Sequence, residues 1–219
     1  MKRKSIFIAA VAVLALVFVG AAQLYRSQQA QQVSQAAARN KESLVRFHSP
    51  MIGNPDARVH IVEFFDPACE TCAAFYPLVK KLMAAHPADI RLSVRYAPFH
   101  PGSDQVVKML EASRKQGKFW ETLEALLASQ PRWVQNHRAE SELVWPTLAR
   151  VGLDTDRVRS DMQSPEIARS IAQDVQDART LNVTQTPEYF VNGRPLPTFG
   201  FEELRTLVEE ELAAANSPK

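Results

Sequence analysis

The stretch VHIVEFFDPACETC, residues 59–72, joins an apolar run to the only two cysteines in the sequence. The run over 59–65 is typical of a buried strand, because Val, Ile and Phe favour strands and Asp66-Pro67 ends the run. Apolar side chains then recur at helical spacing over residues 73–85. This stretch therefore predicts a strand, a turn that carries both cysteines, and a helix.

The segments on either side give the order of the fold. Residues 90–96 predict a second strand, and strand–helix–strand in this order predicts a βαβ unit with a right-handed crossover. Residues 103–180 have helical periodicity and no convincing strand. Asn192-Gly193, within 189–196, is typical of a β-hairpin turn, and 201–214 predict a last helix. The sequence thus predicts an α/β fold with a helical insertion between the βαβ unit and the C-terminal hairpin and helix.

The motif Cys69-Glu70-Thr71-Cys72 suits reversible disulfide chemistry. Two cysteines three positions apart at a helix start can bring their sulfurs together across one turn. The unpaired backbone N–H groups and the helix dipole there stabilise a thiolate on the first cysteine. We expect Cys69 to be an exposed attacking thiol and Cys72, one turn into the helix, to be the resolving thiol.

Other roles for the two cysteines stay open at this point. They could form a structural disulfide, half of a zinc site or part of the core. The five histidines show no ligand spacing around the motif, so no metal site is predicted. A rival function is a copper-binding protein that holds a soft ion with the same two cysteines. A third is a catalytically silent binding module.

Two segments resemble the DsbA family of thioredoxin-fold thiol–disulfide oxidoreductases. They are residues 62–72, VEFFDPACETC, and residues 186–193, TPEYFVNG. The resemblance covers about residues 46–215, and the block over 103–180 matches the helical insertion that distinguishes this family from thioredoxin itself. It implies a thioredoxin fold with that insertion and an activity that requires neither metal nor organic cofactor.

The resemblance also implies roles for particular residues. It makes Cys69 and Cys72 a redox-active disulfide pair, and it places a cis Thr186–Pro187 peptide bond beside them. Because Pro187 has no N–H, the backbone of Thr186 stays free to bind an extended substrate chain. Glu63 matches a buried carboxylate whose raised pKa would suit it to relay the proton of Cys72. The alternative for Glu63 is a carboxylate at a strand edge that reaches solvent.

The dipeptide between the cysteines departs from strongly oxidising DsbA proteins, which carry His there. Here it is Glu70-Thr71, and a carboxylate beside Cys69 disfavours its thiolate. We therefore expect a potential less oxidising than the value of about −120 mV for DsbA. Thr186 resembles the residue before the cis-Pro in the periplasmic isomerases DsbC and DsbG, which favours reductase or isomerase work. The direction of electron flow stays open.

Composition and the N-terminus indicate where the protein acts. The 219 residues carry a net charge of +2, which is too balanced for a nucleic-acid binder driven by phosphate contacts. Lys2, Arg3 and Lys4 precede an uncharged apolar run over 6–22. This pattern predicts export to the periplasm, either anchored to the inner membrane by residues 6–25 or soluble after signal cleavage near Ala22.

Three regions follow from these patterns. Residues 1–26 predict a signal peptide or membrane anchor, 27–45 a helical stalk rich in Gln and Ala, and 46–219 the DsbA-like thioredoxin domain. Ala30, Val33, Ala37 and Leu44 lie near heptad spacing, so weak homo-oligomerisation through the stalk is an alternative to a solvated spacer. The expected partners are cysteine-containing exported proteins and a membrane redox protein that resets the disulfide.

Overall fold

The structure, a computed structural model, describes residues 18, 20, 21, 28, 35 and 42–216. The predicted signal or anchor and most of the predicted stalk therefore lie outside the described residues. Within the part described, no helix is both long and apolar enough to cross a bilayer.

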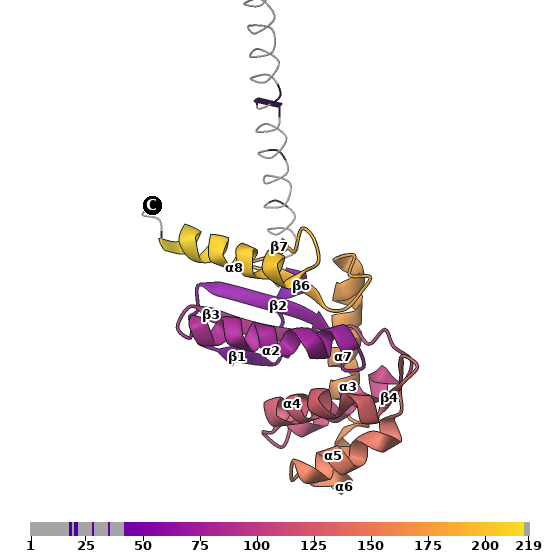
Figure 1. Ribbon diagram of the computed structural model, residues 1–219. Coiled ribbons are helices and arrows are strands. Elements are labelled where there is room, and N and C mark those ends of the chain that lie inside the picture. Colours follow the sequence, from indigo (N-terminus) through magenta and orange to yellow (C-terminus); the bar gives the residue numbers. More distant parts are fainter. Residues whose placement is uncertain (1–17, 19, 22–27, 29–34, 36–41, 217–219) are drawn as a thin grey trace, which may run out of the picture.

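A parallel βαβ unit forms the centre of the fold (Figure 1). Strands β2 (Val59–Phe65) and β3 (Ile90–Tyr96) pair in parallel, from Val59 opposite Ile90 to Phe65 opposite Tyr96. Both agree with the predicted ranges. Helix α2 (Glu70–Ala85) begins three residues earlier than predicted, because Cys69 is its N-cap and the motif itself forms the first turn.

The sheet has five strands in the order β1-β3-β2-β6-β7. Strand β6 (Glu188–Val191) pairs antiparallel with β2, and β7 (Arg194–Pro195) returns along β6. Asn192 and Gly193 form the predicted turn, with φ of 49° and 87°. The edge strand β1 (Met51–Gly53) was not predicted, since three residues are too short for a periodic pattern.

Side chains of β2 alternate between two core clusters, one on each face of the sheet. Ile61 and Phe65 lie in the larger cluster with residues of α2 and of the last helix, α8 (Phe201–Asn216). Val62 and Phe64 lie in the second cluster, with Ala178 of α7 (Pro165–Thr180). Glu63 shares the strand parity of Ile61 and Phe65, and therefore the face covered by the cysteine-bearing helix.

A helical block separates β3 from the C-terminal hairpin, as predicted (Figure 1). Its elements are α3 (Ser103–Arg114), α4 (Phe119–Ser129), the 3-10 turns Gln130–Arg132 and Ser141–Val144, α5 (Trp145–Arg150), α6 (Thr155–Asp161) and α7. The prediction that it contains no strand is wrong. Strands β4 (Val134–Gln135) and β5 (Arg138–Ala139) form a small hairpin, and Asn136 and His137 turn between them with φ of 50° and 58°.

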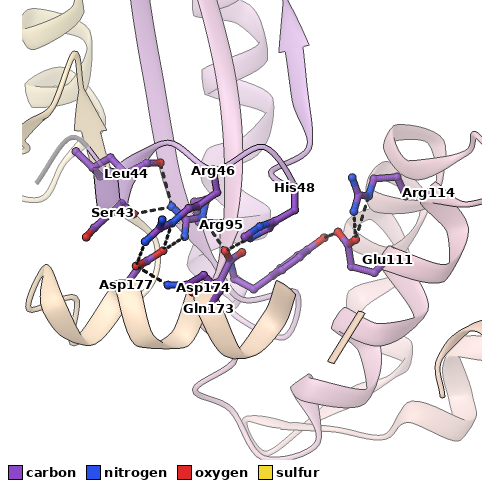
Figure 2. Close-up of polar contacts among 11 residues, drawn as sticks. Ser43, Leu44, Arg46, His48, Arg95, Glu111, Arg114, Gln173, Asp174 and Asp177 are labelled. Atoms are coloured by element: carbon purple, nitrogen blue, oxygen red, sulfur yellow. Dashed lines mark hydrogen bonds and ion pairs between the residues drawn. The ribbon is translucent and has the colours of Figure 1, made fainter. Parts of the chain in front are cut away.

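A buried polar network fastens α7 and the segment before β1 to the sheet (Figure 2). The guanidinium of Arg95, fully buried in β3, donates to Asp174 Oδ1 at 2.8 Å and to Asp177 Oδ2 at 2.6 Å. It also donates to the carbonyl oxygens of Ser43 and Leu44. Leu44, which its spacing assigned to the stalk, packs in the second core cluster. The arrangement of sheet, helices and insertion is the thioredoxin fold that the resemblance implied.

Candidate active site

Asp66 holds the turn that leads into the cysteine motif. Its buried carboxylate accepts hydrogen bonds from the N–H of Ala68 at 2.9 Å and from the hydroxyl of Ser103. The other carboxylate oxygen accepts from the N–H of His100 and contacts Nδ1 of the same residue, both at 2.8 Å. The Asp66 carbonyl accepts from the N–H of Cys69. One carboxylate thus ties together the end of β2, the loop after β3 and the start of α3.

Gln130, from the helical block, reaches the same turn. Its side-chain amide donates to the carbonyl oxygens of Pro67 at 2.8 Å and Cys69 at 3.0 Å, and its side chain is buried. The sequence analysis did not identify Gln130, because 61 positions separate it from Cys69 and no local pattern marks the contact.

The thiol of Cys69 ionises more readily than that of an ordinary cysteine. Its sulfur accepts from the N–H of Cys72 at 3.4 Å and donates as a thiol to the carbonyl oxygen of Thr186 at 3.1 Å. The hydrogen bond with the Cys72 side chain lowers the pKa of Cys69 to about 6, and the backbone N–H groups of Cys72 and Thr71 act in the same direction, against burial. Cys69 is only 5% exposed, so the expectation of an exposed thiol is wrong.

Cys72 lies one turn further along α2 and is completely buried. Burial raises its pKa well above the ordinary value, and the hydrogen bond to Cys69 and the charge of Glu63 add to the rise. Both cysteines carry free thiols in this structure. The two sulfurs therefore differ in the way that an attacking and a resolving thiol must differ: one ionises near neutral pH, and the other keeps its proton.

Glu63 lies in β2 and is fully buried, so the alternative of a carboxylate that reaches solvent is wrong. The hydroxyl of Tyr189 faces Glu63 across the β2–β6 ladder, and no other described side chain pairs with the two carboxylate oxygens. The pKa of Glu63 is raised to about 8, mainly by burial; the hydroxyl of Tyr189 opposes this rise and the charge of Cys69 adds to it. At neutral pH this carboxyl is therefore mainly protonated.

The Thr186–Pro187 segment, which immediately precedes β6, contacts the motif at Cys69. Its peptide bond is cis, and the Thr186 carbonyl oxygen contacts the Cys69 sulfur. The two segments that carried the family resemblance, 114 positions apart, thus lie next to each other at the start of α2.

The dipeptide Glu70-Thr71 forms the first turn of α2. The side chain of Glu70 is 54% exposed, and its Oε1 lies 3.3 Å from Nδ1 of His137 in the β4–β5 turn. His100 lies close by, with its ring centroid 6.4 Å from that of His137. These two histidines are 37 positions apart in the sequence, so spacing along the chain gave no sign that both lie beside Glu70.

Comparison with known proteins relates this chain to thioredoxin-like proteins. Residues 47–210 match the thioredoxin family. A thioredoxin-like oxidoreductase from Silicibacter pomeroyi DSS-3 is 30% identical, with a TM-score of 0.69 over 81% of this chain and 98% of that one. The thiol-disulfide exchange protein alpha-DsbA2 from Wolbachia pipientis is 21% identical, with a TM-score of 0.69 over 84% of this chain and 97% of that one, which shows a shared fold.

A second group of relatives is much longer than this chain. The Na(+)/H(+) antiporter NhaA of Herminiimonas arsenicoxydans is 32% identical over 144 residues, which are 66% of this chain and 22% of the antiporter. The match thus spans about a fifth of the length of such relatives.

Proposed function

This chain belongs to the thioredoxin family, and we propose that it is a DsbA-like protein thiol–disulfide oxidoreductase that exchanges disulfides with cysteines of exported proteins through Cys69 and Cys72. The observation that carries the proposal is the contrast between the two thiols. Hydrogen bonds lower the pKa of Cys69 to about 6, while burial keeps Cys72 protonated.

In the reducing direction, the Cys69 thiolate attacks one sulfur of a substrate disulfide. The substrate S–S bond breaks, a mixed disulfide forms, and the other substrate sulfur leaves as a thiolate that takes up a proton. Cys72 then loses its proton and attacks the sulfur of Cys69, which releases the second substrate sulfur as a thiol. The substrate gains two electrons and the enzyme pair becomes a disulfide; oxidation of a substrate dithiol reverses these steps.

Glu63, once it has given up its own proton, is proposed to accept the proton of Cys72 during that second step. Cys72 needs such a base because burial holds its proton strongly. A carboxyl with a pKa of about 8 exchanges protons readily near neutral pH. In the reverse direction the same group returns the proton to Cys72.

Thr186 and Pro187 are proposed to bind the substrate chain beside its reacting cysteine. The Thr186 carbonyl oxygen is 3.1 Å from the Cys69 sulfur, so a chain held by that backbone would present its own sulfur to the thiolate. Pro187 donates no hydrogen bond that could compete with the substrate.

The proposed potential lies on the thioredoxin side of the scale. A pKa of about 6 for Cys69 is closer to the value of about 7 for thioredoxin than to about 3.5 for DsbA. A less stabilised thiolate means a less stabilised reduced form, which favours reductase or isomerase work. We propose the periplasm as the place of action, with the N-terminal segment as anchor or signal and a membrane redox protein as the source of electrons.

The test is a disulfide-exchange assay with insulin and with a reduced two-cysteine peptide. Cys69→Ser should abolish exchange, and Cys72→Ser should accumulate the mixed disulfide, detected by mass spectrometry. An equilibrium against glutathione gives the potential. Full exchange activity in Cys69→Ser would contradict the proposal. One Cu(I) bound per pair without any exchange would instead favour the copper-binding alternative.

A further inference from the structure

We propose that Glu70, His100 and His137 form a binding site for a divalent transition-metal ion of the zinc or copper type, next to the dithiol and separate from it. One ligand atom from each of these side chains lies within 4.8 Å of the others. Metal binding here would be a function additional to disulfide exchange, because the exchange steps proposed above involve none of these three side chains.

Three separate parts of the fold supply the cluster. Glu70 is the first residue of α2, His100 follows β3, and His137 occupies the turn between β4 and β5. The backbone at His137 is left-handed, with φ of 58°, a conformation in which His, Asn and Asp are enriched among residues other than Gly. That turn presents its imidazole to the carboxylate of Glu70 from across the motif.

The shortest contact has the spacing of two ligands on one ion. Nδ1 of His137 lies 3.3 Å from Oε1 of Glu70. Two such atoms bound to a tetrahedral ion at about 2.0–2.1 Å are about 3.4 Å apart. The side chains of Glu70 and His137 are 54% and 78% exposed, so small rotations can bring them to the same distance from His100.

His100 is already oriented as a ligand. Its Nδ1 is 2.8 Å from the fully buried carboxylate of Asp66, which leaves Nε2 as the nitrogen available to an ion. A carboxylate that holds the far nitrogen of a ligating imidazole is the usual outer-shell support of zinc-bound histidines. This contact belongs to the buried turn and is independent of the Glu70–His137 pair.

The donor set selects the class of ion. Two imidazoles and one carboxylate favour Zn²⁺ or Cu²⁺ over Mg²⁺ or Ca²⁺, which prefer oxygen ligands. Three protein ligands leave one position of a tetrahedral ion open to water or to another ligand. Sulfur is not needed, so the site should persist when Cys69 and Cys72 form a disulfide.

Calorimetric titration of the full chain with Zn²⁺ tests the site, after oxidation of both cysteines or, if they do not couple, after their alkylation. The readout does not depend on exchange activity, so it fails or succeeds separately from the proposed function. The protein with its natural sequence should bind one ion. His137→Asn, a change that the left-handed turn tolerates, and Glu70→Gln should each weaken binding at least tenfold. His86→Gln, about 24 Å away at the other end of α2, should leave it unchanged.

Co²⁺ in place of Zn²⁺ gives a second readout. Its visible spectrum should show nitrogen and oxygen ligation with no thiolate charge-transfer band, and the spectrum should be lost in His137→Asn. The proposal is overturned if His137→Asn and Glu70→Gln bind Zn²⁺ as tightly as the unmodified protein does, or if the oxidised protein binds none.

Discussion

Replacing Glu63 by Gln should remove the fall in folding stability that this carboxyl alone causes as pH rises from about 5 to about 8. The carboxyl is fully buried, and the hydroxyl of Tyr189 only partly offsets the effect of that burial on its pKa. Burial raises its pKa from 4.5 to about 8. Gln has nearly the same shape and no charge, so the substitution isolates the cost of burying an ionisable group.

The sign and size follow from proton linkage. Between the two pKa values the folded state binds more protons than the unfolded state, so stability falls as pH rises through this window and is lowest above about 8. The whole effect is about 5 kcal/mol, from 1.36 kcal/mol for each step of one in pKa. From pH 5 to pH 7 the protein should lose about 2.5 kcal/mol relative to the Gln variant.

Urea unfolding at several pH values between 5 and 8 measures this difference. Both proteins should carry Cys69→Ser and Cys72→Ser, which removes the titration of the thiols and their redox state. The free energies of unfolding of the two proteins should diverge as pH rises. A difference that stays constant over this range would refute the reasoning, because Glu63 would then have the same pKa in the folded and the unfolded chain.

Three further substitutions test the groups around the motif and the sheet. Cys72→Ala removes the largest hydrogen bond to the Cys69 sulfur, so the pKa of Cys69, followed by thiolate absorbance, should rise from about 6 to about 7–8. Gln130→Leu removes both hydrogen bonds that the side-chain amide donates to the active-site turn. It should lower the free energy of unfolding, measured by urea denaturation, by about 1–3 kcal/mol. Asp174→Ala leaves the buried guanidinium of Arg95 with one carboxylate fewer and should cost about 3–5 kcal/mol by the same measurement.

Matched variants serve as controls. Cys72→Ser keeps a hydroxyl donor, so it should hold the pKa of Cys69 below the value in the Ala variant; equal values would contradict the assigned cause. Gln105→Leu removes a solvent-exposed hydrogen bond to Asp104 and should change the free energy of unfolding by less than about 0.5 kcal/mol. Asp89→Ala breaks an exposed ion pair and should cost less than about 1 kcal/mol. If either matches its buried counterpart, burial is not the deciding factor.

The elements that sequence could predict are those with a strong local signal. Strand β2 is a largely apolar run because both faces of the sheet are covered, and β3 alternates Ile90, Leu92, Val94 and Tyr96 with polar residues. The hairpin over 188–195 is marked by Asn192-Gly193, whose residues suit a left-handed turn. In contrast, β1 and the β4–β5 hairpin have two or three residues per strand, too few for any period to be visible.

The site could be predicted only where its residues are adjacent in sequence or belong to a known pair of motifs. The cysteine motif and the Thr186–Pro187 segment meet both conditions. The contacts that hold the site do not: Asp66 lies 34 positions from His100, and Gln130 lies 63 positions from Pro67. Arg95 lies in the buried part of β3, and its carboxylate partners are 79 and 82 positions away. Only the folded chain reveals such pairings.

The side-chain amide of Gln130 links the helical insertion to the turn that carries the cysteines. A chimera that exchanged residues 103–180 for a short loop would keep both sulfurs, yet it would lose the donor that fixes the carbonyl groups ahead of them. A scaffold that receives only the four-residue motif should therefore still form the disulfide. Its cysteines should not have the reactivity they have here unless a side-chain amide is placed to bind the same two carbonyl groups.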